Sequence, residues 1–181
     1  MKNLSPKTRF LINVLIGTSV LLVSGPLAIN MQGYTPITLQ SLAIIAVPVM
    51  FGLQPGAIAI VLYLFAGGLG LPVFADFSGG WDHFSGMTNG FLIGFLPAGV
   101  LAGWWATKLE PQYGRYFLLF LACHVVIMLF GLIGFLLHDM STDQILYNAK
   151  YLFPGLFIKS FMGGFLALAA RPSPSATDSE V

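Results

Sequence analysis

One lysine stands alone inside an apolar run in the second half of the chain. Lys159 is the only charged residue in the segment 151–170, YLFPGLFIKSFMGGFLALAA. A charge within a membrane-spanning segment is costly and by default marks a binding site, a transport pathway or an ion pair. An ammonium group there could bind a carboxylate. The alternative is that the side chain extends to the lipid headgroups, and the residues themselves leave both readings open.

The other ionisable residues form no catalytic or metal-binding pattern. The acids all lie in predicted loops or in the tail, and the histidines lack metal-ligand spacing. No Walker A, G-x-S-x-G or H-E-x-x-H motif is present. We therefore expect no enzyme, no metal site and no cofactor, and we expect His124 to pack within its helix and bond to a neighbouring one. The residues surveyed are Asp76, Asp82, Glu110, Asp139, Asp143, Asp178, Glu180, His83, His124 and His138.

Composition places the chain in a bilayer. Of its 181 residues, 56% are hydrophobic and only 8% are charged, whereas soluble domains are about 25% charged. The 21 glycines suit close helix packing in lipid. A net charge of +1 argues against a nucleic-acid partner, and a single cysteine, Cys123, excludes a disulfide framework.

Six hydrophobic segments predict an all-α integral membrane protein with six transmembrane helices in one domain, residues 10–171. A short amino terminus, 1–9, precedes this domain, and a Ser- and Pro-rich tail, 172–181, is expected to be disordered. The first segment is too long for a signal-peptide core and is retained as a helix. Residues 54–56 predict a tight turn, and 73–89 a long irregular loop. The segments are 10–29, 39–53, 57–71, 90–107, 116–137 and 154–170.

Basic residues predict the orientation. Short cytoplasmic loops are enriched in Lys and Arg, and with both termini cytoplasmic most of these residues fall inside, in a multi-pass protein of the plasma membrane. The loop 73–89, which has none, then faces outward. If the sixth helix starts at Pro154, Lys159 lies about five residues in, in the outer half of the membrane. The inside residues are Lys2, Lys7, Arg9, Lys108, Arg115 and Arg171.

Polar groups on the outer side could share a pocket with Lys159. The loop 73–89 is long enough to act as a lid, and its glycines expose backbone N–H groups. Thr35, Thr38 and Gln40 start the second helix from the same side. The alternatives are a plain surface loop, simple helix caps, and, for Trp81, either an interfacial position or a cover over a ligand.

Four ordered segments resemble motifs of the BioY family. TPITLQSL (35–42) is similar to P-I-T-L-Q-x-L, and GGLGLPVFADFSGG (67–80) to G-L-P-V-F followed by a glycine-rich loop. GMTNGFLIGF (86–95) resembles G-P-T-G-G-Y-L-x-G-F, and FPGLFIKSF (153–161) resembles P-G-D-x-x-K. The resemblance implies a biotin-binding S component of an energy-coupling factor transporter, with six helices, an outward-facing vitamin pocket, a transmembrane coupling protein and two cytosolic ATPases.

The resemblance also implies roles for particular residues. Lys159 falls on the family lysine and would meet the biotin carboxylate, while Phe91 keeps the aromatic ring of the G-Y pair without its hydroxyl. Leu156 replaces the family acid. Another acceptor, such as Asp76, Ser78 or Asn89, must then serve, or the ligand differs.

These inferences predict a substrate-binding membrane subunit for vitamin uptake, with biotin as substrate rather than cofactor. The alternatives are an S component for another small carboxylate-bearing vitamin and a ligand-free membrane scaffold. A homo-oligomer stays open. The expected binding residues are Lys159, Phe91, Phe74, Ser78, Gly79, Gly80, Asn89, Gln40 and Asp76.

Overall fold

The computed structural model describes residues 4–29 and 37–170, which form six α-helices with little other regular structure. Two-residue strands β1 (Ala28–Ile29) and β2 (Ile37–Thr38) pair antiparallel, and 3₁₀ helices η1 (Ala75–Phe77) and η2 (Trp81–Phe84) lie between α3 and α4. The predicted helical class is confirmed. Thr35, the first three residues and the tail from 171 lie outside the described residues. The helices are α1 (Pro6–Ser24), α2 (Gln40–Phe51), α3 (Leu53–Gly68), α4 (Asn89–Ala106), α5 (Tyr113–Leu137) and α6 (Thr142–Ala169).

Four of these helices, α1, α4, α5 and α6, are long and apolar enough to cross a membrane. The other two are shorter, with 12 residues in α2 and 16 in α3. Large apolar side chains cover the outside of the molecule, which is the reverse of a soluble protein. On α1 and α6 they include Leu11, Leu15, Val23, Phe157, Ile158 and Phe165. Such a surface is suited to contact with lipid.

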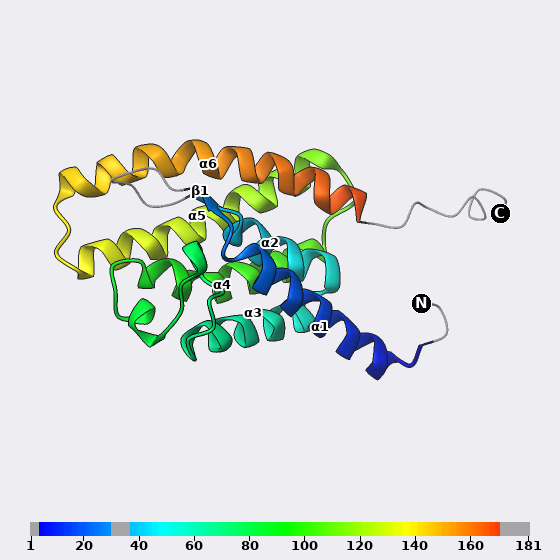
Figure 1. The fold of residues 1–181 in the computed structure, drawn as a ribbon. Helices are drawn as coiled ribbons and strands as arrows, with labels where there is room; N and C mark the ends of the chain where they lie inside the picture. Colours follow the sequence, from blue (N-terminus) through cyan, green and yellow to red (C-terminus); the bar gives the residue numbers. More distant parts are fainter. Residues whose placement is uncertain (1–3, 30–36, 171–181) are drawn as a thin grey trace.

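Helix α2 lies inside the bundle (Figure 1), and every residue from Gln40 to Pro48 is buried. The most extensive helix contact is between α4 and α5. It depends on glycine, because a Cβ atom on Gly131 would overlap the ring of Phe91, and one on Gly90 would overlap the backbone of Phe130. Small residues thus bring the two helices close together, as in other membrane bundles.

Local sequence signals explain where several helices begin and end. Ser5 accepts a hydrogen bond from the Thr8 amide at 3.1 Å, and Pro6 follows as the first residue of α1. The break between α2 and α3 is at Gly52, whose φ of 99° is readily reached only by glycine. The predicted turn at residues 54–56 is therefore wrong, because these residues form the first turn of α3, where a proline is tolerated.

Helix α6 begins at Thr142, about three turns earlier than predicted. Ser141 and Gln144 form a capping box, each side chain bonding to the backbone of the other. Pro154, the predicted start of the helix, lies inside α6. Lys159 is consequently past the middle of this 28-residue helix and not five residues from its beginning.

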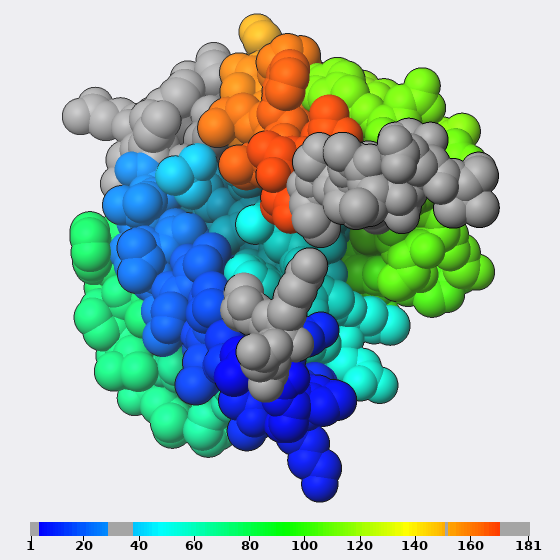
Figure 2. Space-filling model, turned by 90° about the vertical axis from the view of Figure 1, so that its right-hand side faces the viewer, coloured from blue at the N-terminus to red at the C-terminus, as the bar shows by residue number. Residues whose placement is uncertain are grey.

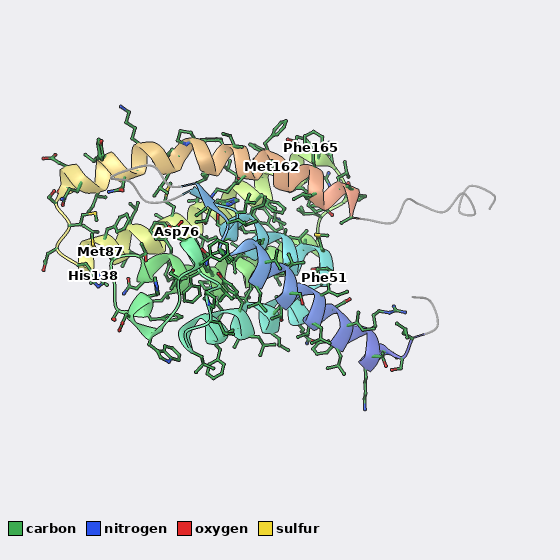
Figure 3. All side chains as sticks on the ribbon, viewed as in Figure 1. Phe51, Asp76, Met87, His138, Met162 and Phe165 are labelled. Atoms are coloured by element: carbon green, nitrogen blue, oxygen red, sulfur yellow. The ribbon has the colours of Figure 1, made fainter. Side chains whose placement is uncertain are left out.

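The two ends of the bundle differ in charge. Helix α1 begins and α6 ends at one end, which the connection between α4 and α5 also reaches (Figure 1). We call it the basic end, because it carries Lys7, Arg9, Lys108 and Arg115. Figure 2 looks onto this end, with α1 and α6 on opposite sides. The other end, the loop end, holds the α3–α4 loop and the α5–α6 connection; Met87 and His138 both lie there (Figure 3).

Candidate functional site

A cavity of about 400 Å³ lies between α2, α4, α5, α6 and the α3–α4 loop. Its volume is within the range of small-molecule sites, and its wall is mainly apolar with a few polar groups, as such sites are. The lining residues from α2 and the strand before it are Thr38, Gln40 and Ser41; the loop contributes Phe74, Ala75, Asp76, Ser78, His83 and Thr88; the other helices contribute Phe91, Leu92, Phe95, His124, Ile127, Met128, Leu152, Leu156 and Lys159.

Lys159 reaches from α6 to the start of α2. Its ammonium donates hydrogen bonds to the backbone oxygen of Thr38 at 3.2 Å and to Oγ of Ser41 at 2.8 Å. An ammonium has three donors, so one remains for a ligand. Among the described residues no carboxylate forms an ion pair with Lys159. The ion pair that the described residues do form joins Arg115 and Glu110, which do not line the cavity. The cavity therefore contains a positive charge that no carboxylate of the described residues neutralises.

Gln40 is buried and holds the loop in place. Its Nε2 donates to the hydroxyl of Tyr63 on α3, and that hydroxyl donates to the backbone oxygen of Val73 at 2.9 Å. The side chain of Gln40 lines the cavity, but one donor of its amide is already used. Its position joins α2, α3 and the beginning of the loop.

The first part of the loop folds into a tight turn over the cavity. The backbone N–H of Phe74 donates to the oxygen of Ser78 at 2.9 Å, and Ser78 Oγ donates to the oxygen of Ala75 at 2.6 Å. Asp76 has a φ of 60°, an unusual conformation for a residue with a side chain. Figure 3 shows it inward of Met87 and His138. Phe74, Asp76 and Ser78 all line the cavity.

Three predicted binding residues are outside the cavity wall. Gly79 and Gly80 follow the turn, and Gly80 donates its N–H to the oxygen of Gly67 at 2.7 Å, so it fixes the loop to α3. Asn89 starts α4, and its side-chain oxygen is buried close to Gly134 of α5. These residues support the cavity from behind its wall, because their polar groups are directed to the backbone or to the interface between α4 and α5.

Aromatic rings form much of the remaining wall. Phe74 is almost fully buried and packs edge-on against Tyr63 and His83, with ring centroids 5.7 and 5.5 Å apart. Phe91 packs against Phe135 at 5.5 Å. Trp81, in contrast, is 56% exposed and does not line the cavity. Phe74 and Phe91 thus offer flat apolar surfaces for the body of a ligand.

Sequence reasoning missed several lining residues, of which His124 is the most informative. The predicted bond to a neighbouring helix is present, since Nδ1 of His124 lies 3.2 Å from Oγ of Ser160 on α6. The histidine also lines the cavity, as do Ser41 and Met128. For His124 and Ser41 the available signal was a polar residue within an apolar run, and Ser41 also directly follows Gln40.

Comparison with known proteins adds two findings. A family model described as the BioY family matches residues 1–175. A solved structure described as the S-component for biotin from an ECF-type ABC transporter superposes with a TM-score of 0.84. That alignment covers 94% of this chain and 96% of the other at 22% identity, and it establishes a shared fold.

Curated relatives align over parts of the chain. Biotin transporter BioY2 of Lactococcus lactis subsp. cremoris is 32% identical over 118 residues, which are 65% of this chain and 64% of the relative. Biotin transporter BioY of Thermotoga maritima is 35% identical over 56% of this chain and 60% of its own length. That of Rhodobacter capsulatus is 46% identical over 38% and 36%. The chain thus spans less than two thirds of the length of these relatives.

Proposed function

The chain belongs to the BioY family, and we propose that it is the membrane subunit that binds biotin for uptake. The alignments with named biotin transporters support this proposal, as does the fold shared with an S-component for biotin. On this view the protein performs transport rather than catalysis, and biotin is its substrate and not a cofactor.

One observation carries the proposal: a cavity of ligand size contains an ammonium that no described carboxylate neutralises. A buried charge without a partner is expensive. An anionic ligand would offset that cost, and biotin has one carboxylate. The third donor of Lys159 is left over after Thr38 and Ser41 and would meet this carboxylate. The cavity also argues against a ligand-free scaffold, for which no such space is needed.

The four segments that resemble BioY motifs meet at this cavity. Gln40, Phe74, Phe91 and Lys159 come from one segment each, and all four line the wall. We propose that the two aromatic rings contact the apolar body of the ligand, while Gln40, Asp76 and Ser78 contribute polar groups at its edge. Gly79, Gly80 and Asn89 would act indirectly, by holding the loop and the start of α4.

We further propose six membrane-embedded helices with both termini in the cytoplasm of the cell. The basic end of the bundle supports this orientation, because Lys and Arg are enriched on cytoplasmic sides and α1 begins there as α6 ends there. The loop end and the mouth of the cavity would then face outward. Transport would need a transmembrane coupling protein and cytosolic ATPases, the partners that the resemblance to BioY implies; the structural relative is itself described as a component of an ECF-type ABC transporter.

The proposal is tested by titrating purified protein with labelled biotin. We expect saturable binding by the wild type and a loss of about 10-fold or more for Lys159→Ala, because a hydrogen bond to a charged group contributes about 1.5–3 kcal/mol. Lys150→Ala is the matched control, since Lys150 is an exposed lysine of the same helix and does not line the cavity. Absence of saturable binding by the wild type would refute the function; equal affinity of wild type and Lys159→Ala would refute the role of the lysine.

A second candidate is uptake of another small carboxylate-bearing vitamin. Leu156 favours it, because this buried side chain lines the cavity where the family motif has an acid. A panel of vitamins in a thermal-shift assay separates the two candidates. Stabilisation by a different compound, with none by biotin, would establish the second.

A further inference from the structure

His124 has one ring nitrogen that is fully engaged and one that is not. The side chain is only 4% exposed and lines the cavity from α5. Nδ1 lies 2.9 Å from the backbone oxygen of Phe120 and 3.2 Å from Oγ of Ser160. Nε2 is buried and has no hydrogen-bond partner among the described residues. Buried polar atoms are rarely left in this state, and each one calls for an explanation.

The partners of Nδ1 determine which nitrogen carries the proton. The Phe120 carbonyl can only accept. Ser160 donates its own hydroxyl proton to the oxygen of Leu156 at 2.8 Å, so its Oγ is also an acceptor toward the histidine. Nδ1 must therefore be the N–H donor of the neutral ring. Nε2 then carries a lone pair and can only accept. A doubly protonated ring would add a second unpaired charge to a site that already holds the Lys159 ammonium, which is costly.

We propose that Nε2 of His124 accepts a hydrogen bond from an N–H group of the transported ligand. This inference rests on the proposed function and names a recognition contact within the same cavity. Lys159 and His124 offer opposite chemistry, because the ammonium only donates and this nitrogen only accepts. They therefore select a ligand that carries both an oxygen acceptor and an N–H donor. In biotin the N–H donors are the two ring nitrogens of the ureido group.

The energetics favour this contact over an apolar one. A buried acceptor without a donor loses its hydrogen bond to water and receives nothing in return. A ligand N–H restores that bond in a site of low dielectric constant, where hydrogen bonds are strong. Nε2 is almost inaccessible to solvent, so a ligand reaches it only when a neighbouring side chain turns aside. Met128 lines the same cavity one turn along α5, and its unbranched chain adapts readily.

A purely structural role for the histidine predicts something different. Nδ1 already joins α5 to α6 through Ser160, and losing that link would lower stability without regard to the N–H groups of a ligand. Ligand chemistry distinguishes the two roles. The probes are biotin and its two mono-N-methyl derivatives, in each of which one ureido N–H is replaced by N–CH₃. The proteins are the wild type, H124F, which keeps a ring without the acceptor, and H124Q, which keeps a side-chain oxygen.

Affinities are measured by titration calorimetry on protein that elutes as a single species in detergent. In the wild type we expect methylation at one of the two nitrogens to weaken binding by about 10-fold or more, the effect of one hydrogen bond lost at a buried acceptor. H124F should bind biotin about 10-fold more weakly, and the same methylation should then cost less than about 2-fold. H124Q should fall between the two proteins. His83→Phe, at another lining histidine, is the control and should keep the sensitivity to methylation.

Each outcome decides the matter. If H124F binds biotin as tightly as the wild type, or if methylation costs the same in both, the contact does not exist, although the proposed function stands. If the wild type does not bind biotin at all, the proposed function fails and this inference fails with it. Should H124F not fold, the wild type and H124Q still decide. Equal affinity of the wild type for biotin and both methylated derivatives overturns the proposal. If methylation at one nitrogen weakens binding to the wild type, a smaller loss of affinity in H124Q upholds the proposal and an equal loss overturns it.

Discussion

The hydroxyl of Tyr63 joins three parts of the structure, and its removal should destabilise the protein measurably. Tyr63 is completely buried. Its hydroxyl accepts from Nε2 of Gln40 and donates to the backbone oxygen of Val73 at 2.9 Å. The change Tyr63→Phe removes one oxygen atom and keeps the ring, which still packs against Phe74 with centroids 5.7 Å apart. Two buried polar groups then lose their partner.

The magnitude follows from those two groups. An unsatisfied buried donor or acceptor costs about 1–3 kcal/mol, so Tyr63→Phe should lower the free energy of unfolding by about 2–6 kcal/mol. Tyr113→Phe is the matched control. Its hydroxyl makes one long bond, 3.5 Å to the oxygen of Phe161, at an exposed position. The control should therefore change the free energy by no more than about 0.5 kcal/mol.

Reversible unfolding of the purified protein in mixed micelles provides the measurement. Biotin affinity, measured on the same samples, should fall with Tyr63→Phe, because Val73 begins the loop that covers the cavity and would lose its anchor to α3. The reasoning is refuted if Tyr63→Phe and Tyr113→Phe have the same stability. In that case the buried chain from Gln40 through Tyr63 to Val73 would contribute nothing to the fold.

Three further changes should have smaller or differently directed effects. Hydrogen bonds from His138 to the backbone oxygens of Gly134 and then Ser85 raise the pKa of this half-buried ring. The stabilisation is therefore complete below about pH 6.5 and is lost as the pH rises through the raised value. Amide exchange between pH 5 and 8 should show that the protection of the α3–α4 loop falls at higher pH, and equal protection at every pH would contradict this prediction. Ser141→Ala removes the capping box of α6 and should lower the free energy of unfolding by about 1 kcal/mol; no change in a denaturation curve would mean that the cap is not formed. Gly131→Val should prevent the close packing of α4 on α5 and reduce both the melting temperature and biotin affinity, whereas Gly114→Val, at an open position of α5, should leave both nearly unchanged.

Much of the helical architecture could be predicted because each helix leaves a local signal. Five of the six predicted segments both begin and end within five residues of the observed helices. The exception is the start of α6. A proline suits the first turn of a helix, so Pro154 suggested a beginning, but the true start lies in a polar stretch where Ser141 and Gln144 provide the cap. The helix begins before the hydrophobic pattern does, because the first turns of α6 are polar.

The site could be predicted only in part, since a cavity is a property of packing. The isolation of Lys159 was visible in the sequence, but its bonds to Thr38 and Ser41 join positions more than a hundred residues apart. The exclusion of Asn89 from the wall has the same origin, because the rotation of α4 against α5 decides which side chain points inward. His124 was expected to bond to a neighbouring helix, and it does; that its other nitrogen would lack a partner could not be inferred without the bundle.

The unequal lengths of the helices have a consequence for the surrounding bilayer. Helix α3 exposes apolar side chains such as Ile58, Val61 and Phe65 but rises only about 24 Å along its axis, whereas α5 and α6 rise about 37 and 42 Å. The hydrocarbon core of a bilayer is about 30 Å thick. Lipids beside α3 must thin, and those beside α5, which is the most apolar of the long helices, must thicken or the bundle must tilt. The polar first turns of α6 can lie outside the hydrocarbon. The side of the bundle formed by the long helices is therefore taller than the side formed by α3. Bilayers whose lipids have acyl chains of different length should change the tilt of the protein and the depth at which the cavity opens.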